Sequence, residues 1–389
     1  MAFRLLLFFV AGMLATAAGC SDMTLIQCDE DSDCQGLNIC TSEGLCSAPS
    51  EEEIDGSDDD DDDDTGDDDT GDDDSDDDDT SDDDDTSDDD DDLGDDDRTW
   101  TAVSAGQHHS CGILSDDSVQ CWGVSDGGMV DHGQVTQAPS TGTFMQVSAG
   151  GSHSCAIDDA GQLHCWGAGV GTDPTFGPHH GQSAPPQGTY SHVSAGHEHT
   201  CALDSSGAIQ CWGRNEYGQT NAPTGNFSRV SAGTYHSCAI DTDGLVHCWG
   251  IDDGTSQDFG QVADTPDGAS YVEISAGWSH TCALQDGTLR CWGVSDGSQN
   301  VDYGQVSEVD GLSGFDEVSV GQYHTCGIAQ GQLQCWGGSL GVGGAVAQPP
   351  TGEHWSLTSG KQHACALNAV GGQGLSCWGY DGYGQASPP

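Results

Sequence analysis

Pairs of short apolar runs separated by a polar turn recur along most of the chain, and residues 153–167 show the pattern most fully. The runs HSCAI and QLHCWG flank Asp159-Ala160-Gly161, a sequence suited to a three-residue hairpin loop with glycine in the left-handed place. Neither run alternates strictly between apolar and polar residues, which is typical of strands covered on both faces. The pattern therefore predicts buried antiparallel hairpins.

Each predicted hairpin carries one cysteine in each of its two strands, although the spacing differs between copies. Cys155 and Cys165 are ten residues apart, whereas Cys282 and Cys291 are nine apart around the two-residue turn Asp286-Gly287. Counting outward from the turn brings the cysteines opposite each other in both copies, within reach of a disulfide. Seven cross-strand disulfides are predicted, with buried free thiols as the alternative. The pairs are Cys111–Cys121, Cys155–Cys165, Cys201–Cys211, Cys238–Cys248, Cys282–Cys291, Cys326–Cys335 and Cys365–Cys377.

Two copies depart from the usual turn composition. The first turn, Ser115-Asp116-Asp117, has no glycine, so Asp117 is expected to adopt the left-handed conformation. In the last copy the cysteines are twelve residues apart, and the glycine-rich segment NAVGGQG is expected to absorb the extra length.

The hairpins belong to a longer repeat. The glycine of a V-S-A-G element falls at positions 106, 150, 196, 233, 277, 321 and 360, and each unit closes with a segment that contains Gly-Gln. A period near forty with several strands per unit indicates the blades of a β-propeller. The predicted fold class is therefore all-β, a seven-bladed propeller over residues 99–389. The opening strand TWTAVSAG is expected to join the last blade and close the ring.

The pattern VSAGxxHSCAI…GxLxCWG…YGQ resembles the repeat of the regulator of chromosome condensation family. It is most similar to the bacterial extracellular branch, which includes a secreted β-lactamase inhibitor. The resemblance implies a seven-bladed propeller, and family members serve as nucleotide exchange factors, enzyme inhibitors or binding scaffolds. Paired cysteines stand where that pattern is usually apolar, which fits an exported version.

The first nineteen residues resemble a secretion signal. MAFRLLLFFVAGMLATAAGC has one basic residue, an apolar run and small residues before a cysteine. AAGC resembles a bacterial lipobox, so residues 1–19 are interpreted as a lipoprotein signal peptide and Cys20 as the lipidated residue. Ala17 stands where leucine is more usual, which keeps ordinary cleavage and secretion as the alternative. The expected location is the bacterial cell envelope, as an outer-membrane or cell-surface lipoprotein in an oxidising compartment.

Two further segments precede the repeats. Residues 20–50 hold the anchor and a small four-cysteine module, interpreted as a spacer, whose pairing the sequence leaves open among three possibilities. Its cysteines are Cys28, Cys34, Cys40 and Cys46. Residues 51–98 are predicted to be a disordered linker, because positions 51–97 hold thirty Asp and three Glu. It is interpreted as a solvated tether, with loose calcium binding as the alternative.

Charge narrows the range of partners. From residue 99 onward there are twenty-seven acidic side chains against Arg214, Arg229, Arg290 and Lys361. That balance argues against nucleic acid or an anionic membrane surface as the partner. Contact with a membrane is expected only through the lipid on Cys20, and the protein is expected to be a monomer.

One histidine and one tryptophan recur in every unit, and both are interpreted as structural. A catalytic site requires different groups at one place, whereas a repeated residue makes the same contact in each blade. The histidine is expected to hydrogen-bond a neighbouring backbone group, and the tryptophan to pack between blades. The histidines are His109, His153, His199, His236, His280, His324 and His363. The tryptophans are Trp122, Trp166, Trp212, Trp249, Trp292, Trp336 and Trp378.

The candidate binding rim lies at the two variable positions between V-S-A-G and the histidine. Its aromatic members are Tyr235, Trp278 and Tyr323. The longer variable segments at 124–144, 168–190 and 294–314 are the other candidate surface. The sequence contains no nucleophile elbow, phosphate loop, HExxH or EF-hand loop, so no catalytic, cofactor or metal residue is predicted.

These observations favour an exported, lipid-anchored propeller that acts as a non-catalytic binding scaffold for a protein partner at the cell envelope. An inhibitor of a secreted enzyme or a glycan-binding lectin is the alternative. Guanine-nucleotide exchange is a less favoured alternative that follows from family analogy alone.

Overall fold

Strands make up the regular structure of the part of the chain that the computed structural model describes. That part comprises residues 39–40, 46–47, 99–169, 179–295, 297, 301–338, 348–369 and 374–389. The chain divides into two compact units, Met1–Asp91 and Asp92–Pro389. Within these ranges no helix is long and apolar enough to cross a membrane.

In the first unit, β1 (Ile39–Cys40) pairs antiparallel with β2 (Cys46–Ser47), and Cys40 lies opposite Cys46. The predictions on the signal peptide, Cys20, Cys28, Cys34 and the Asp-rich linker concern residues outside the described ones.

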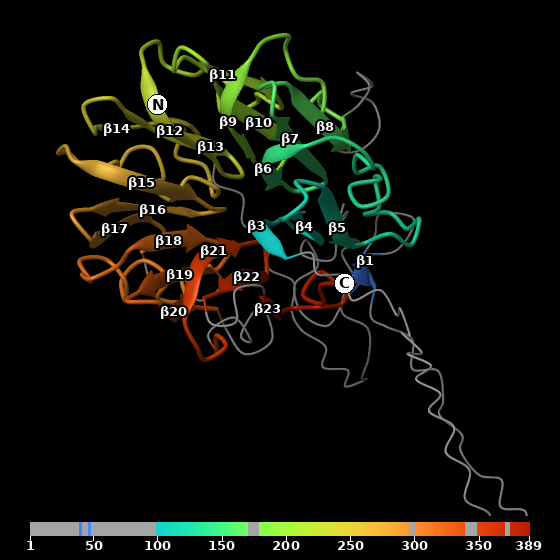
Figure 1. Cartoon of the computed structure of the whole chain (residues 1–389). Helices are drawn as coiled ribbons and strands as arrows, with labels where there is room; N and C mark the ends of the chain where they lie inside the picture. Colours follow the sequence, from blue (N-terminus) through green and yellow to red (C-terminus); the bar gives the residue numbers. More distant parts are fainter. Residues whose placement is uncertain are drawn as a thin grey trace, which may run out of the picture. The chain divides into compact units, whose positions relative to one another are not determined.

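The second unit contains seven antiparallel sheets of three strands each, here called blades 1 to 7 (Figure 1). The predicted seven-bladed propeller is confirmed. Blade 1 is β3 (Trp100–Ala105), β4 (His109–Leu114) and β5 (Val119–Gly123), and blade 2 is β6 (Phe144–Ala149), β7 (His153–Asp158) and β8 (Leu163–Gly167). Blade 3 is β9 (Tyr190–Ala195), β10 (His199–Asp204) and β11 (Ile209–Gly213), and blade 4 is β12 (Phe227–Ala232), β13 (His236–Asp241) and β14 (Val246–Gly250). Blade 5 is β15 (Tyr271–Ala276), β16 (His280–Gln285) and β17 (Thr288–Gly293), and blade 6 is β18 (Glu317–Val320), β19 (His324–Ala329) and β20 (Gln332–Gly337). Blade 7 is β21 (His354–Ser359), β22 (His363–Asn368) and β23 (Leu375–Gly379).

The first strands of successive blades lie side by side and form the innermost ring, in which β21 of blade 7 neighbours β3 of blade 1. The serine of V-S-A-G ties these strands together. Ser104 Oγ accepts a hydrogen bond from Ala149 N of the next blade, at 2.9 Å, and the same bond recurs at every junction. Thr358 replaces the serine in blade 7 and accepts from Ala105 N at 3.0 Å. The repeated hydroxyl therefore closes the ring.

The prediction that the strand at Trp100–Ala105 joins the last blade is wrong. This strand is the innermost strand of its own blade, with the order β3-β4-β5. The described Gly-Gln segments form turns and add no fourth strand to a blade. Blade 7 therefore has its three strands from its own residues and needs none from the start of the repeats. Closure comes instead from Thr358 and from the C-terminal segment, where the Gln385 carbonyl accepts from Trp122 Nε1 and Ser110 Oγ, both at 3.0 Å.

All seven predicted disulfides are present. In each pair the two Cα atoms are directly opposed across the hairpin, 4.0–4.1 Å apart, at separations of nine, ten or twelve residues. The turns absorb the difference as expected, with Asp286 at φ 50° and Asp117 at φ 63°. The glycine-rich segment of the last hairpin lies partly outside the described residues.

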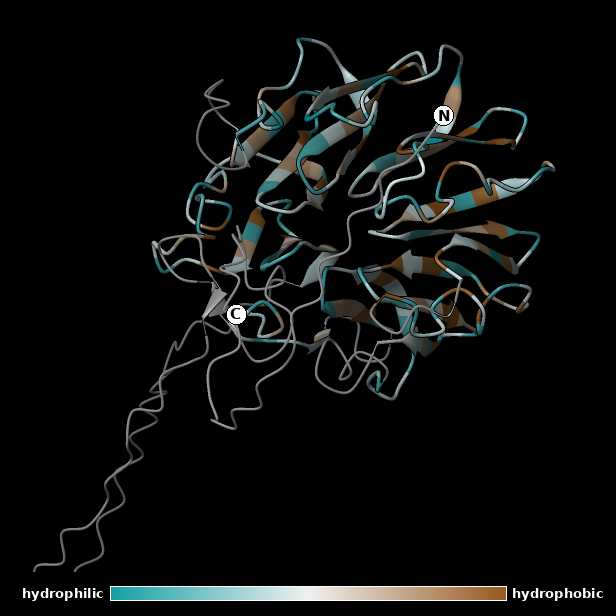
Figure 2. Cartoon of the chain, turned by 180° about the vertical axis from the view of Figure 1, so that it is seen from behind, coloured by the Kyte–Doolittle hydropathy of each residue, from teal (hydrophilic) through white to brown (hydrophobic). Residues whose placement is uncertain are grey.

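Apolar side chains fill the interfaces between blades. Cys111 and Ile113 of blade 1, for example, form one buried cluster with Phe144, Val147 and Trp166 of blade 2. Figure 2 shows hydrophobic segments interspersed with hydrophilic ones along the strands. Trp166 is only 4% exposed, so it packs between blades as predicted. Each blade is therefore stabilised by its two neighbours.

Candidate functional site

The recurrent histidines lie in the blade interfaces, where they are almost fully buried. In six of the seven, Nε2 is 2.6–2.9 Å from a serine or threonine hydroxyl of the next blade, as His199 is from Ser237. The Ser237 hydroxyl donates its single hydrogen to the Gln219 carbonyl at 3.0 Å. Nε2 must therefore carry the proton, and the imidazole is neutral. The expected structural role holds, but the partner is a hydroxyl group, not the backbone.

Burial lowers the pKa of these imidazoles strongly, to about 3 for His153 and about 4 for His236. Neighbouring histidines lower the pKa of His153 further. Blade 7 breaks the series, because Ala364 stands where other blades have serine or threonine. His324 Nε2 is consequently buried with no hydrogen-bond partner among the described residues.

The Gly-Gln element completes this interface. The Gln219 side chain is fully buried, and its Oε1 accepts from Tyr217 N at 2.9 Å. Its backbone carbonyl also accepts from Trp249 Nε1 at 2.8 Å. The repeated His, Trp and Gln thus have structural roles in the interfaces between blades. The residues that differ from blade to blade are therefore the candidates for function.

The predicted rim residues are brought together by the structure. The turn after each first strand and the loop after each third strand lie at the same end of a blade, here called the rim end. Trp278 packs edge-to-face against Tyr323, with ring centroids 5.0 Å apart. Burial raises the pKa of Tyr235, and a hydrogen bond from Trp278 opposes that shift. Tyr235, Trp278 and Tyr323 therefore form one contact series across blades 4 to 6.

Two further tyrosines belong to the same surface. Tyr217 packs against Tyr235 at 5.1 Å, and Tyr303 packs against Tyr323 at 5.5 Å. Both precede Gly-Gln, so the Tyr-Gly-Gln motif was the signal that could have identified them. We call the five side chains the aromatic rim: Tyr217, Tyr235, Trp278, Tyr303 and Tyr323. All five are half-buried, so each offers part of a fixed ring to solvent.

A charged group borders the aromatic rim. Arg214 donates to both Glu198 and Glu216. Arg214 and Glu198 also act electrostatically on Tyr235, although with smaller effect than burial. One of the few basic side chains of the propeller is therefore held beside the rim between two carboxylates.

A second departure from the repeat lies on the innermost strands. One register position is occupied by Gln146, His192, Arg229, Glu273 and Glu317 in blades 2 to 6. Glu273 Oε1 accepts from Val318 N at 3.3 Å, and Glu317 Oε1 accepts from Leu357 N at 3.0 Å. Burial raises the pKa of Glu273 to about 7. Burial and the neighbouring Glu273 charge raise that of Glu317 to about 8. Sequence analysis missed this carboxyl pair because only the ring brings the two blades together.

The carboxyl pair gives the propeller an alkaline instability. The folded state holds protons that the unfolded chain releases near pH 4.5, so stability falls as pH rises from there through 7 and 8. Each group contributes at most about 1.4 kcal/mol per pH unit. We expect the free energy of unfolding of the wild type, measured by urea titration, to fall by a few kcal/mol between pH 6 and 9 relative to that of a variant without the two carboxyl groups.

The E273Q/E317Q double variant keeps both oxygen acceptors and loses the titration. Subtracting its free energy of unfolding from that of the wild type at each pH removes the contribution of the buried histidines, which rises over the same range, and leaves that of the carboxyl pair. A wild-type slope that survives in this variant would assign the alkaline effect to other groups.

No group of three or more His, Cys, Asp or Glu side chains in the described ranges is placed to hold a metal ion. The calcium-loop-like sequence at 241–244 forms a hairpin turn, in which Asp241 Oδ1 accepts from Asp243 N and Leu245 N, both at 2.9 Å. The Asp-rich linker, for which loose calcium binding is the alternative to a solvated tether, lies outside the described residues.

A closed ring of seven three-stranded blades with an aromatic rim defines the class of protein: a β-propeller whose variable surface is its candidate functional site. The Regulator of chromosome condensation (RCC1) repeat matches residues 100–134, 146–170, 190–219, 227–261 and 271–305. The chain therefore contains five repeats of this RCC1-like family. No curated protein sequence matches it.

Solved structures agree on the fold. The ectodomain of the Physcomitrella patens receptor kinase CR4 is similar with a TM-score of 0.52 and 23% identity, over 72% of this chain and 74% of that one. Prp20p from Saccharomyces cerevisiae has a TM-score of 0.51 and 18% identity, over 69% of this chain and 82% of that one. Human WBSCR16 has a TM-score of 0.53 and 18% identity, over 70% and 88%. At these identities the likeness establishes the propeller architecture.

Proposed function

We propose that this chain is an exported, non-catalytic scaffold that binds a protein partner through its aromatic rim. The observation that supports this proposal is the contact series of the aromatic rim. Tyr235, Trp278 and Tyr323 occupy variable positions of the repeat, and Tyr217 and Tyr303 extend the series from the Tyr-Gly-Gln element. Tyrosine and tryptophan dominate protein interfaces because they supply large, rigid surfaces with a polar handle. Propellers of this architecture include Prp20p, whose crystal structure was described along with its binding to Gsp1p and histones.

Export is supported by the disulfides. Seven cross-strand disulfides persist only in an oxidising compartment. We propose that Cys20 carries a lipid and that the Asp-rich linker tethers the propeller to a bacterial envelope. Mass spectrometry of the N-terminal peptide checks the anchor, because an unmodified Cys20 would contradict it.

The test of the rim compares two variants of the full chain in capture from native envelope extract. W278A/Y323A removes the centre of the aromatic rim. W355A removes an exposed tryptophan, 54% accessible, at the other end of an innermost strand and serves as the matched control. A partner captured by the wild type and W355A should bind W278A/Y323A at least about 30-fold more weakly, as expected for the loss of central aromatic anchors.

Circular dichroism of W278A/Y323A must first show an intact fold. Equal capture by the folded double variant would overturn the rim assignment. A glycan array with the wild type, W355A and W278A/Y323A tests the alternative that the rim is a lectin site. Glycan binding that is lost only in W278A/Y323A would support that alternative.

A further inference from the structure

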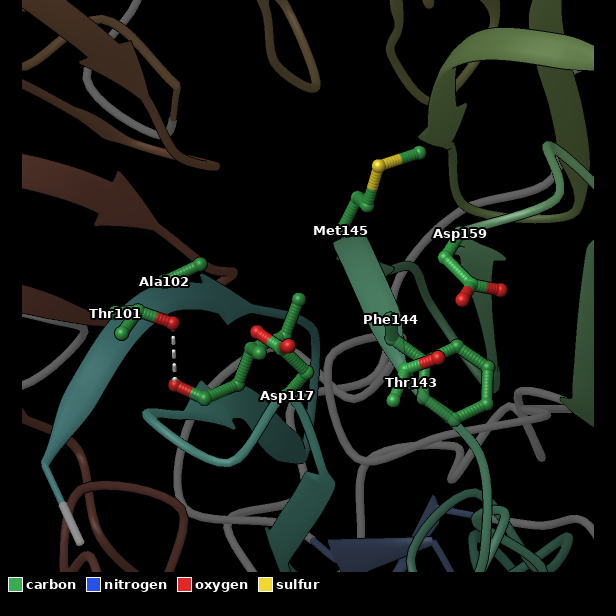
Figure 3. A pocket seen from close by; sticks show the side chains of 8 residues that line it. Thr101, Ala102, Asp117, Thr143, Phe144, Met145 and Asp159 are labelled. Carbon is green, nitrogen blue, oxygen red and sulfur yellow. Dashed lines mark hydrogen bonds between the residues drawn. The ribbon is translucent and has the colours of Figure 1, made fainter.

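A pocket of about 350 Å³ opens between blades 1 and 2, at the hairpin end opposite the rim (Figure 3). Ala102, Ile113, Phe144 and Met145 supply its apolar wall. Phe144 is buried, whereas Met145 is 63% exposed. The volume is at the lower end of the roughly 300–1,000 Å³ typical of ligand sites. An extended apolar chain can therefore enter beside Met145 and lie against Phe144.

The pocket exists because blade 1 breaks the pattern of the innermost strands. At the same register in blade 2, Gln146 has a long side chain that covers the junction between blades 2 and 3. Its Oε1 accepts a hydrogen bond from Val193 N at 3.0 Å. Ala102 is the smallest side chain in the series and makes no such bridge. The space that a glutamine fills between blades 2 and 3 is consequently open between blades 1 and 2.

Two carboxylates line the same pocket, from hairpin turns of different blades. Asp117 comes from the β4–β5 turn and Asp159 from the β7–β8 turn, and Figure 3 shows them on either side of the start of β6. Backbone bonds fix both turns to this strand: Phe144 N donates to Asp117 O at 2.8 Å, and Asp159 N donates to Thr143 O at 3.1 Å. Neither carboxylate has a hydrogen-bond or ion-pair partner in the described part of the chain. The pocket thus combines an apolar wall with two solvent-exposed negative charges, carried by turns whose backbones are tied to the strand.

We propose that this pocket binds a lysine side chain presented by a protein partner, at a site distinct from the aromatic rim. The methylene stem of lysine packs on apolar surface while its ammonium group stays at the polar edge. The lysine ammonium is a compact point charge with three donors, so it can pair with a carboxylate at the edge of the pocket without the planar geometry that an arginine fork requires. From residue 99 onward the chain has twenty-seven acidic side chains and four basic ones, and this negative charge attracts a partner with a cationic surface.

The experiment uses the full chain, disulfides intact, with ¹³C-labelled methionine methyl groups. Met145 lines the pocket, and Met129, 60% exposed, is an internal control away from it. The probes are Nα-acetyl-lysine methylamide and the uncharged Nα-acetyl-norleucine methylamide, which has a similar stem. We expect the lysine probe to shift the Met145 methyl signal saturably, with the norleucine probe binding at least about fivefold more weakly, and Met129 to stay unchanged.

Substitutions separate charge from shape. D117N/D159N keeps the turns, since asparagine tolerates the φ of 63° at position 117, and should weaken the lysine probe about fivefold. D243N removes a hairpin-turn carboxylate of blade 4 that does not line the pocket and should change nothing. A102Q should abolish the Met145 shift by filling the pocket. The proposal would be overturned by equal binding of both probes, by an unchanged affinity in D117N/D159N, or by the lack of a saturable shift in the wild type. These outcomes do not depend on the results for the rim variants.

Discussion

Acidification from pH 7 to pH 5 is expected to unfold the propeller, although most proteins of this size tolerate that range. Seven buried imidazoles have pKa values of about 3 or 4 in the folded state, whereas an unfolded histidine titrates near 6.5. Their contribution to stability is complete above pH 6.5 and is lost as pH falls toward 4, because the unfolded chain takes up protons that the folded chain excludes.

The size of the acid effect follows from the number of sites. Each histidine costs about 2 kcal/mol at pH 5, so seven together approach 14 kcal/mol, comparable to the roughly 5–15 kcal/mol that stabilises a typical domain. Urea titrations at pH 7, 6.5, 6 and 5.5 measure the slope of the free energy of unfolding against pH. Because Glu273 and Glu317 keep about two protons in the folded state over this range, we expect the net slope to reach about three to five protons below pH 6, which is about 4–7 kcal/mol per pH unit.

A single-site variant calibrates this slope. H236Q keeps a hydrogen-bond donor for Thr281 and removes one titrating group, so the proton uptake should fall by about one. If the wild type takes up only one or two protons on unfolding, the histidine array does not control acid stability.

Reduction of the seven disulfides is expected to unfold the propeller at neutral pH and 25 °C. Each disulfide closes a hairpin of nine to twelve residues, and the chain-entropy relation assigns about 2.7 kcal/mol to a loop of that size. Even with incomplete additivity, the loss from seven bonds exceeds the stability of an ordinary domain. Tryptophan fluorescence and circular dichroism after reduction and thiol alkylation measure the outcome.

The matched variant removes one staple alone. C201A/C211A in blade 3 should keep the fold and lose about 3 kcal/mol in urea titration. Fully reduced protein that keeps the native spectrum and melting temperature would show that interface packing suffices without the disulfides.

The two pH effects act in opposite directions and set an optimum. Below pH 6.5 protonation of unfolded histidines dominates, and above pH 7 ionisation of Glu273 and Glu317 dominates. Maximum stability is therefore expected near pH 7.

Sequence alone was sufficient wherever the cause is local. The turn at Asp286-Gly287 and the longer turn at Asp159-Ala160-Gly161 each place their cysteines opposite one another, because register is counted from the turn. The same reasoning assigned positive φ to Asp117. The recurrence of these units every forty residues or so then implied the propeller, since one hairpin cannot bury a core alone.

Contacts between blades were accessible only in part. Tyr235, Trp278 and Tyr323 were identified as variable positions, yet their contact with each other depends on how blades 4, 5 and 6 are spaced around the ring. Glu273 and Glu317 lie forty-four residues apart in the sequence, and nothing local reveals that the charge of Glu273 raises the pKa of Glu317.

The sequence by itself determined the strands, the hairpin register, the seven disulfides and the repeat, because turn chemistry and residue spacing act over about ten positions. Tertiary structure alone decided how the ring closes, through Thr358 and Gln385 in place of a borrowed strand. It also decided that Ala102 leaves an open pocket between Asp117 and Asp159. These features depend on which side chains of two different blades meet, and that follows from the geometry of a closed ring.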